Sequence, residues 1–198
     1  MGIVTLVSGG FDSTLMSLMA QEEGMALFPL FLDYGQLGAV KEWEACKLLH
    51  ENYGLPEVMR MNLQGFGKAI PSGLTDSNLR INEDAFLPGR NLLFILVGAA
   101  YAYKVGAHSV ALGLLDPSDH LFPDQTKKFI EDAEHVIETT MGKRINIRTP
   151  LIDFSKSDVL AMARARGLQG TYSCHAGGDK PCGVCVACVE ISNAVERI

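Results

Sequence analysis

A short glycine-containing segment between two apolar stretches constrains this chain more than any other feature. The sequence Ser8-Gly9-Gly10-Phe11-Asp12-Ser13-Thr14 follows the apolar residues 3–7 and precedes an apolar-periodic segment that starts at Leu15. This order predicts a buried strand, a glycine turn and the N-terminus of a helix. Glycine has no Cβ atom to keep a ligand from the backbone, and the free amides at a helix N-terminus attract anions. We therefore expect this segment to bind a phosphate group.

Two other phosphate-binding motifs do not describe this segment. No Gly-Lys-Ser/Thr ending follows Gly10, so the segment is not a Walker loop. It also lacks the third glycine of the dinucleotide-binding fingerprint. A Ser/Gly turn that caps an ordinary helix is the alternative. The preceding strand and the following Asp12-Ser13-Thr14 favour phosphate binding.

Apolar and amphipathic segments alternate along the rest of the chain. Runs typical of buried strands occupy residues 25–32, 58–61, 109–115 and 145–151, and helical patterns occupy residues 39–53, 92–103, 125–141 and 155–166. Together with the first strand, this alternation predicts an α/β, Rossmann-like fold with five mostly parallel strands and helices on both faces. The 198 residues suit a nucleotide-binding domain at 1–169 with a small C-terminal metal-binding element at 170–198.

Polar residues follow several predicted strands, at the edge where open α/β sheets bind their ligands. Asp33 and Gln36 follow the second strand, and a polar lip at residues 116–124 follows the fourth. The carboxylates of the lip, Asp124 among them, could bind Mg²⁺ or hydrogen-bond a base-like substrate, and His120 could act as a base. Capping and turn roles are the alternatives for each of these residues.

Two cations lie at predicted helix N-termini, where the helix dipole disfavours positive charge. Arg90 begins the helix that follows a long Gly-, Asn-, Ser- and Pro-rich connection at 62–86, and Lys156 follows the predicted cap Ser155. A bound anion such as a nucleotide phosphate would explain both positions. The alternatives are a solvent-exposed lysine and a loop arginine beside an asparagine cap, Asn91.

Four of the five cysteines gather near the C-terminus. Cys182, Cys185 and Cys188 form a Cys-x-x-Cys-x-x-Cys motif, and Cys174 precedes them. Four thiolates at this spacing, with glycine turns between them, predict a closed tetrahedral zinc site with a structural role. An iron–sulfur cluster is the alternative, although the downstream Cys-Pro of the ferredoxin pattern is absent. Cys46 lies apart, and we expect it in the core.

Charge and cysteine usage limit the partners and the compartment. The net charge of −6 disfavours a broad nucleic-acid-binding surface. No secretory leader precedes the first strand, and the longest apolar stretch, residues 92–103, is too short to span a bilayer. Free cysteines without a leader point to a reducing compartment. We therefore expect a cytoplasmic protein that binds neither nucleic acid nor a membrane.

Taken in chain order, these motifs resemble the 7-cyano-7-deazaguanine synthase family of queuosine biosynthesis, within the PP-loop ATP pyrophosphatase superfamily. The resemblance rests on residues 8–14, Asp33-Tyr34-Gly35-Gln36, Pro88-Gly89-Arg90-Asn91, Pro123-Asp124 and the C-terminal cysteines. It implies an adenine-nucleotide α-hydrolase-like fold with ATP, Mg²⁺ and Zn²⁺, and commonly a homodimer.

The resemblance also implies a ligase that forms carbon–nitrogen bonds. An acid, 7-carboxy-7-deazaguanine, would receive AMP from ATP with release of pyrophosphate. Ammonia would then give the amide, and a second adenylation would lead to the nitrile. The residues expected to bind the nucleotide are Val7, Ser8, Gly9, Gly10, Phe11, Asp12, Ser13, Thr14, Asp33, Gln36, Arg90, Asn91 and Gly113. The expected catalytic residues are Asp12, Arg90, Lys156 and Asp124, and the expected metal ligands are Cys174, Cys182, Cys185 and Cys188.

The half of the site that would recognise the acid departs from the family pattern. Leu37 and Gly38 stand where basic residues are usual, and His175 stands where an aromatic residue is typical. Two alternatives therefore stay open. One is a related adenylating ligase for another acid, either a small molecule or a protein. The other is a non-enzymatic ATP-binding module.

Overall fold

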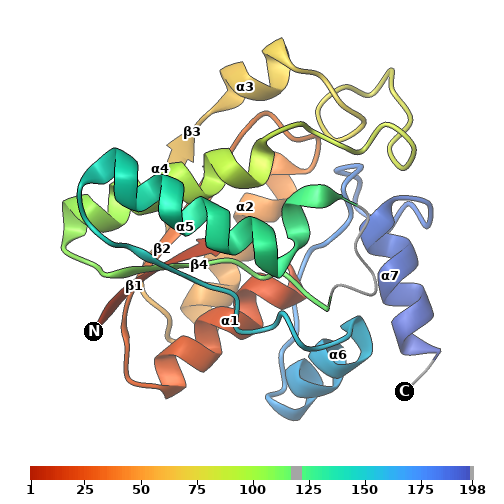
Figure 1. Cartoon of the computed structure of the whole chain (residues 1–198). Coiled ribbons are helices and arrows are strands. Elements are labelled where there is room, and N and C mark those ends of the chain that lie inside the picture. Colours follow the sequence, from red (N-terminus) through yellow and green to blue (C-terminus); the bar gives the residue numbers. More distant parts are fainter. Residues whose placement is uncertain (117–121, 197–198) are drawn as a thin grey trace.

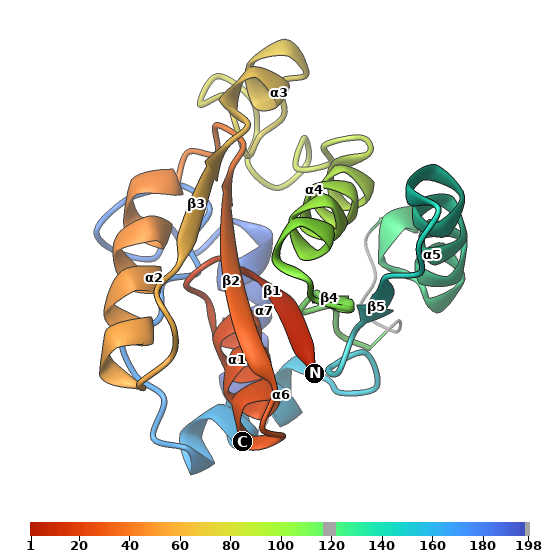
Figure 2. The ribbon, with the colours of Figure 1, turned by 90° about the vertical axis from the view of Figure 1, so that its left-hand side faces the viewer.

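A five-stranded, wholly parallel sheet forms the centre of the computed structural model, which describes residues 1–116 and 122–196. The strands lie in the order β3-β2-β1-β4-β5, as Figure 2 shows. They are β1 (Gly2–Val7), β2 (Ala26–Asp33), β3 (Met59–Asn62), β4 (Ser109–Ala111) and β5 (Asn146–Arg148). The predicted α/β class is confirmed.

Helices cover both faces of this sheet (Figure 1). One face carries α1 (Phe11–Glu22), α2 (Ala39–Asn52) and α6 (Lys156–Ala165), and α7 (Val186–Val195) packs beside α6. The other face carries α4 (Arg90–Val105) and α5 (Lys127–Met141). The short α3 (Gln64–Ala69) and the 3-10 helix η2 (Pro123–Gln125) lie in connecting segments.

The core divides into layers because side chains alternate between the two faces of a strand. In β1, Ile3 packs with α1 and α6, whereas Val4 packs with α4 and α5. Both side chains are almost fully buried, as expected for a strand that has a neighbour on each side and helices above and below. Because β1 is the central strand, the turn that follows it lies at the middle of the sheet edge.

Most predicted elements are confirmed, with some corrections. The fourth and fifth strands are shorter than the apolar runs that predict them, because only β4 and β5 themselves pair in the sheet. The connection at 62–86 contains α3. The amphipathic pattern at 39–53 predicts that Val40, Trp43, Leu48 and Leu49 face the core, but Val40 and Leu48 are 64% and 57% exposed. The residues of α2 that are buried are Ala45, Cys46, Leu49 and His50.

Cys46 is a core residue, as expected, and burial raises the pKa of its thiol to about 12.

In the described ranges, no helix combines the length and the hydropathy that a bilayer span requires.

Candidate active site

A cavity of about 320 Å³ opens at the carboxyl ends of β1, β2 and β4. This is the edge where parallel α/β sheets bind ligands, at the point where the chain connections diverge. Its volume lies at the lower end of the range for small-molecule sites. The predicted site residues that line it are Val7, Ser8, Gly10, Asp12, Ser13, Gln36, Arg90, Asn91, Gly113 and Lys156.

The glycine turn after β1 has the conformation that its sequence predicts. Gly9 has a φ of +77°, which favours glycine, and a Cβ atom there would lie 2.6 Å from the carbonyl oxygen of Glu42. Gly10 lines the cavity and precedes the first residue of α1. The backbone amide of Ser8 donates to Ser13 Oγ (3.1 Å), and Thr14 Oγ1 donates to the Gly10 carbonyl (2.8 Å). These hydroxyls hold the turn at the N-terminus of α1.

Asp12 and Lys156 form an ion pair at this turn. Lys156 Nζ lies 2.7 and 2.8 Å from the two carboxylate oxygens of Asp12. Lys156 is the first residue of α6, whose capping box is confirmed: Ser155 Oγ accepts from the Asp158 amide and Asp158 accepts from the Ser155 amide. The cap therefore holds a buried lysine beside the glycine turn, and the alternative of a solvent-exposed lysine is wrong.

Arg90 begins α4, and aromatic rings flank its guanidinium. The guanidinium carbon lies 5.9 Å from the ring centroids of Tyr34 and Phe94, and these two rings pack on each other. Within the described ranges, no carboxylate lies within ion-pair distance of Arg90. The cation–π contacts orient the side chain, whose guanidinium can pair with an anion in the cavity. Asn91 is buried, and its side chain donates to the Asp124 carbonyl (3.0 Å).

Other predicted residues do not line the cavity: Gly9, Phe11, Thr14, Asp33 and Asp124. Asp33 is 1% exposed, and its carboxylate accepts from Arg60 (2.5 Å) and Gln64 (2.9 Å). Burial raises the pKa of Asp33, but the hydrogen bonds from Arg60, Gln64 and Gly35 outweigh it and lower the pKa overall. Residues 117–121, which include His120 of the predicted lip, lie outside the described ranges.

Several residues line the cavity that the sequence did not single out for the site. The polar ones are Tyr34, Glu42, Gln125, Tyr172, Ser173, His175 and Glu190. Tyr34 lies inside the Asp-Tyr-Gly-Gln motif, so its position was available from the sequence. The sequence marks His175 only as a departure from the family pattern. Glu42 lies among other charged residues of α2, so no local signal marks it. Glu190 is the single charged residue of α7, a signal that could have found it.

His175 brings a neutral imidazole to the cavity. Its Nδ1 atom is buried without a hydrogen-bond partner in the described structure. Burial, together with Arg90 and Lys156, lowers the pKa of His175 to about 4. A neutral ring can offer one donor and one acceptor to a bound molecule.

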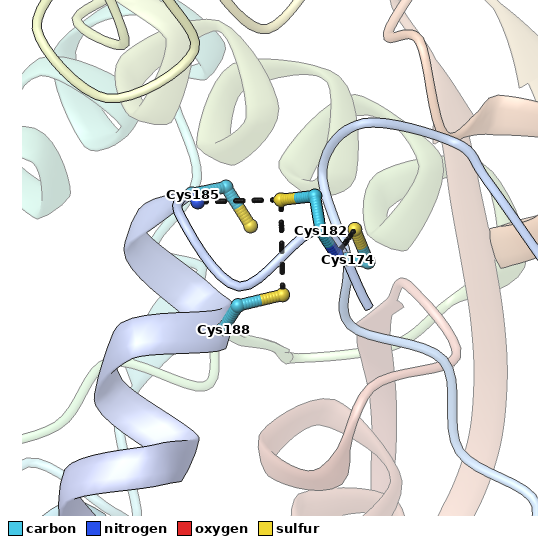
Figure 3. A group of neighbouring side chains, drawn as sticks. All are labelled: Cys174, Cys182, Cys185 and Cys188. Carbon is cyan, nitrogen blue, oxygen red and sulfur yellow. Dashed lines mark hydrogen bonds between the residues drawn. The ribbon is translucent and has the colours of Figure 1, made fainter. Parts of the chain in front are cut away.

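Four cysteine sulfurs converge between the loop at 174–182 and the start of α7 (Figure 3). Cys185 is the N-cap of α7, and Cys188 lies in its first turn. The four Sγ atoms lie within 4.8 Å of one another. Zinc–sulfur bonds of about 2.3 Å in a tetrahedron would place the sulfurs about 3.8 Å apart, so the donor set fits a metal ion.

Backbone amides support the same interpretation. The amides of Cys182 and Cys185 donate to Cys174 Sγ and Cys182 Sγ, each at 3.3 Å. Such bonds to sulfur stabilise thiolates, which are the metal-binding form. The predicted ligands therefore come together as a candidate metal site.

The cysteine-bearing segment also builds one wall of the cavity. The Tyr172 amide donates to the Gly9 carbonyl (2.8 Å), so the segment is attached to the glycine turn. A Cβ atom on Gly177 would lie 2.4 Å from the Leu37 carbonyl, which shows how closely the segment packs on the turn after β2. Tyr172, Ser173 and His175 thereby face the same space as Arg90.

Comparison with known proteins gives one consistent family. A family model described as "Queuosine biosynthesis protein QueC" matches residues 2–198. A 7-cyano-7-deazaguanine synthase from Campylobacter curvus is 32% identical over 197 residues, which cover 93% of this chain and 88% of that protein. A protein of the same name from Acetivibrio thermocellus is 33% identical over 201 residues, which cover 94% of this chain and 89% of that protein.

A solved structure supports the fold. The U34-tRNA thiolase NcsA from Methanococcus maripaludis, determined with its 4Fe-4S cluster, superposes with a TM-score of 0.57 at 14% identity. The match covers 99% of this chain and 65% of the thiolase chain. At this identity the likeness concerns the fold alone.

Proposed function

The chain belongs to the QueC family of queuosine biosynthesis, and from this premise we propose that it converts 7-carboxy-7-deazaguanine, ammonia and ATP to 7-cyano-7-deazaguanine, AMP and pyrophosphate. The curated relatives are ligase-type enzymes and match most of this chain, so the chain is an enzyme of this type.

One observation carries the proposal. The glycine turn, Lys156 and Arg90 come from three distant parts of the chain and line a single cavity. Free amides at the start of α1 and two cations are the groups that a triphosphate requires. The guanidinium of Arg90 has aromatic support and no ion-pair partner in the described ranges, so it can pair with an incoming phosphate.

The chemistry explains why an acid needs ATP here. A carboxylate is a poor electrophile because its leaving group would be oxide or hydroxide. Transfer of AMP to a carboxylate oxygen gives an acyl adenylate, whose leaving group is AMP. The amides of the glycine turn would hold the departing pyrophosphate, and Arg90 and Lys156 would stabilise charge on the transferring phosphate.

Asp12 has the position to bind a divalent ion. Its carboxylate lines the cavity at the first turn of α1, and a Cβ atom on Gly113 would lie 3.2 Å from Asp12 Cβ, so glycine leaves room for this side chain. Mg²⁺ bound there would neutralise charge on the phosphates. Asp12 keeps Lys156 aligned with the glycine turn.

Product analysis tests the proposal directly. The acid carrying ¹⁸O in its carboxylate is incubated with ATP and ammonium. We expect AMP and pyrophosphate, with one label transferred to AMP, because the carboxylate oxygen leaves with that phosphate. We also expect one AMP for each amide and two for each nitrile. Formation of ADP and phosphate, or unlabelled AMP, would refute the acyl adenylate.

A second cavity favours one alternative, the same chemistry on a larger acid. This cavity of about 480 Å³ shares Lys156, Val186 and Glu190 with the first, and the valines at 184 and 189 are 57% and 41% exposed beside it. An acid with an apolar extension would fit such a space. Pyrophosphate exchange into ATP with a peptide carboxylate, and none with the deazaguanine acid, would favour this candidate.

The bound metal and the assembly belong to the same proposal. We expect Zn²⁺ on Cys174, Cys182, Cys185 and Cys188, and a homodimer in the cytoplasm. Elemental analysis of the purified protein would distinguish zinc from iron with inorganic sulfide. Sedimentation equilibrium would give the mass of the assembly, and a monomer at all concentrations would refute the dimer.

A further inference from the structure

Glu42 is a carboxylate in the wall of the reaction cavity to which the adenylation chemistry gives no task. It lies in the first turn of α2. Gln36 Nε2 donates to Glu42 Oε2 at 2.9 Å. The backbone fixes Gln36 in turn, because its Oε1 accepts from the Tyr34 amide (3.0 Å) and its Nε2 also donates to the Leu32 carbonyl (3.3 Å). Gln36 therefore holds Glu42 in one orientation, and the backbone holds Gln36.

The turn before α2 leaves space for this carboxylate. A Cβ atom on Gly38 would lie 2.8 Å from Glu42 Oε1, so any larger residue at this position would displace the carboxylate. Glycine at this position therefore leaves the carboxylate in the orientation that Gln36 sets.

The charges around Glu42 come from several elements. Arg90 of α4 favours its ionised form, and Asp33 of β2 opposes it. Three more titratable groups face Glu42: Tyr34, Tyr172 and, on the same helix as Glu42, Cys46. Burial is the largest influence and raises the pKa of Glu42 to about 7. A carboxyl group with this pKa can both accept and release a proton near neutral pH.

Two other acidic groups near the cavity, Asp12 and Asp33, already have basic partners. Asp12 is paired with Lys156, and Asp33 accepts from Arg60 and Gln64 outside the lining. The hydrogen bonds from Arg60 and Gln64 lower the pKa of Asp33 and so disfavour proton uptake there. Glu42 has a neutral amide, Gln36, as its hydrogen-bond partner.

We propose that Glu42 accepts the proton that the ammonia nitrogen loses when it attacks the acyl adenylate. This inference rests on the proposed function. The nitrogen lone pair forms the C–N bond, and the carbonyl electrons move to oxygen. One N–H proton passes to Glu42, the C–O bond to AMP breaks with its electron pair leaving on AMP, and the amide remains. Glu42 then releases its proton to solvent.

The test separates adenylation from amide formation in the Glu42→Gln variant. Glutamine keeps the size of the side chain and an oxygen for Gln36, but it cannot take up a proton. Without ammonia, pyrophosphate exchange into ATP with the acid should stay within about threefold of the wild type, because adenylation does not use this proton. With ammonium, the rate of amide formation should fall about 10²- to 10³-fold.

The pH profile of amide formation gives a second readout. In the wild type, the rate measured at a fixed concentration of free ammonia should rise as pH increases through about 7, where Glu42 ionises. This rise of the rate with pH, the limb that reports Glu42, should be absent in Glu42→Gln. The Glu44→Gln variant is the matched control, because Glu44 lies on the same helix, is exposed and does not line the cavity. It should behave as the wild type in both assays.

The outcomes distinguish this inference from the proposed function. Absence of acid-dependent exchange in the wild type would refute the proposed function and this inference with it. Normal exchange together with full amide formation in Glu42→Gln, or an unchanged pH limb, would refute the role of Glu42 alone. If the glutamine variant does not fold, Glu42→Asp keeps a carboxylate on a shorter arm. It should keep the limb at a lower rate, and loss of the limb there would refute the role.

Discussion

At the scale of single residues, Lys156 is the buried cation beside the glycine turn that the proposed adenylation would use. The Lys156→Met variant keeps much of the side-chain volume but removes the charge beside the glycine turn. We expect kcat/KM for ATP to fall about 10²- to 10³-fold, because a fixed cation stabilises the transferring phosphate. Pyrophosphate exchange measures this loss.

The Lys127→Met variant is the control for Lys156. Lys127 pairs with Asp153 at 2.5 Å, but both side chains are more than half exposed. Such pairs contribute at most about 1 kcal/mol, so both activity and stability should change little. Equal activities of the two variants would contradict the role given to Lys156.

His50 gives the fold a pH dependence that is independent of the site. Its ring is 3% exposed, and Nδ1 lies 2.6 Å from the Pro56 carbonyl oxygen. Burial lowers the pKa of His50 below its ordinary 6.5. The neutral ring is favoured in the folded state, so its contribution to stability is present above pH 6.5 and is lost as pH falls through the lowered pKa.

Urea unfolding at several pH values tests this expectation. The free energy of unfolding should decrease below pH 6.5 by up to about 1.4 kcal/mol per pH unit. His50→Gln should show a smaller decrease, and His135→Gln, a change at an exposed position, should follow the wild type. Parallel profiles for all three proteins would contradict the assignment.

At the scale of elements, we expect the cap of α6 to link stability to the proposed nucleotide binding. Replacement of Ser155 by alanine removes the oxygen that accepts from the Asp158 amide (3.2 Å) and should cost about 1 kcal/mol. Because Lys156 is the next residue, KM for ATP should rise as well. Urea unfolding and exchange kinetics measure the two effects.

The cap of α5 offers a matched comparison. Thr126 Oγ1 accepts from the Phe129 amide (3.1 Å), and α5 supplies no cation to the cavity. Thr126→Ala should cost a similar free energy. It should leave KM for ATP nearly unchanged. A rise in KM as large as that of Ser155→Ala would mean that general loosening of the fold, and not the position of Lys156, causes the effect.

At the scale of the whole molecule, the metal site should control both the C-terminal segment and the nucleotide site. Removal of the metal by a chelator leaves four thiolates within 4.8 Å of one another, which repel. We expect the segment at 172–188 to lose protection from hydrogen exchange. The protein should also bind ATP more weakly, because Tyr172 and its neighbours line the cavity.

Restoring zinc should reverse both effects. Cys46→Ser serves as a cysteine control, since Cys46 is buried in a different cluster with Val7 and Phe31. It should change stability without changing the metal content. Unaltered ATP affinity in the metal-free protein would contradict the coupling between the two sites.

Local backbone requirements made much of this protein predictable from the sequence. A turn at Gly9 with positive φ, a capping box from Ser155 to Asp158 and the spacing of the C-terminal cysteines each depend on neighbours in the chain. The alternation of apolar segments likewise predicts the parallel sheet. The sequence therefore determined the fold class, the glycine turn and the set of candidate metal ligands.

Only the tertiary structure decided which side chains meet in the cavity. Asp33 looked like a site residue, yet Arg60 and Gln64 hold its carboxylate away from the lining. Glu42 looked like an ordinary helical glutamate, yet the packing of α2 against the glycine turn brings it to the wall. The physical reason is that burial and pairing arise from contacts between residues distant in the chain, which no local pattern records.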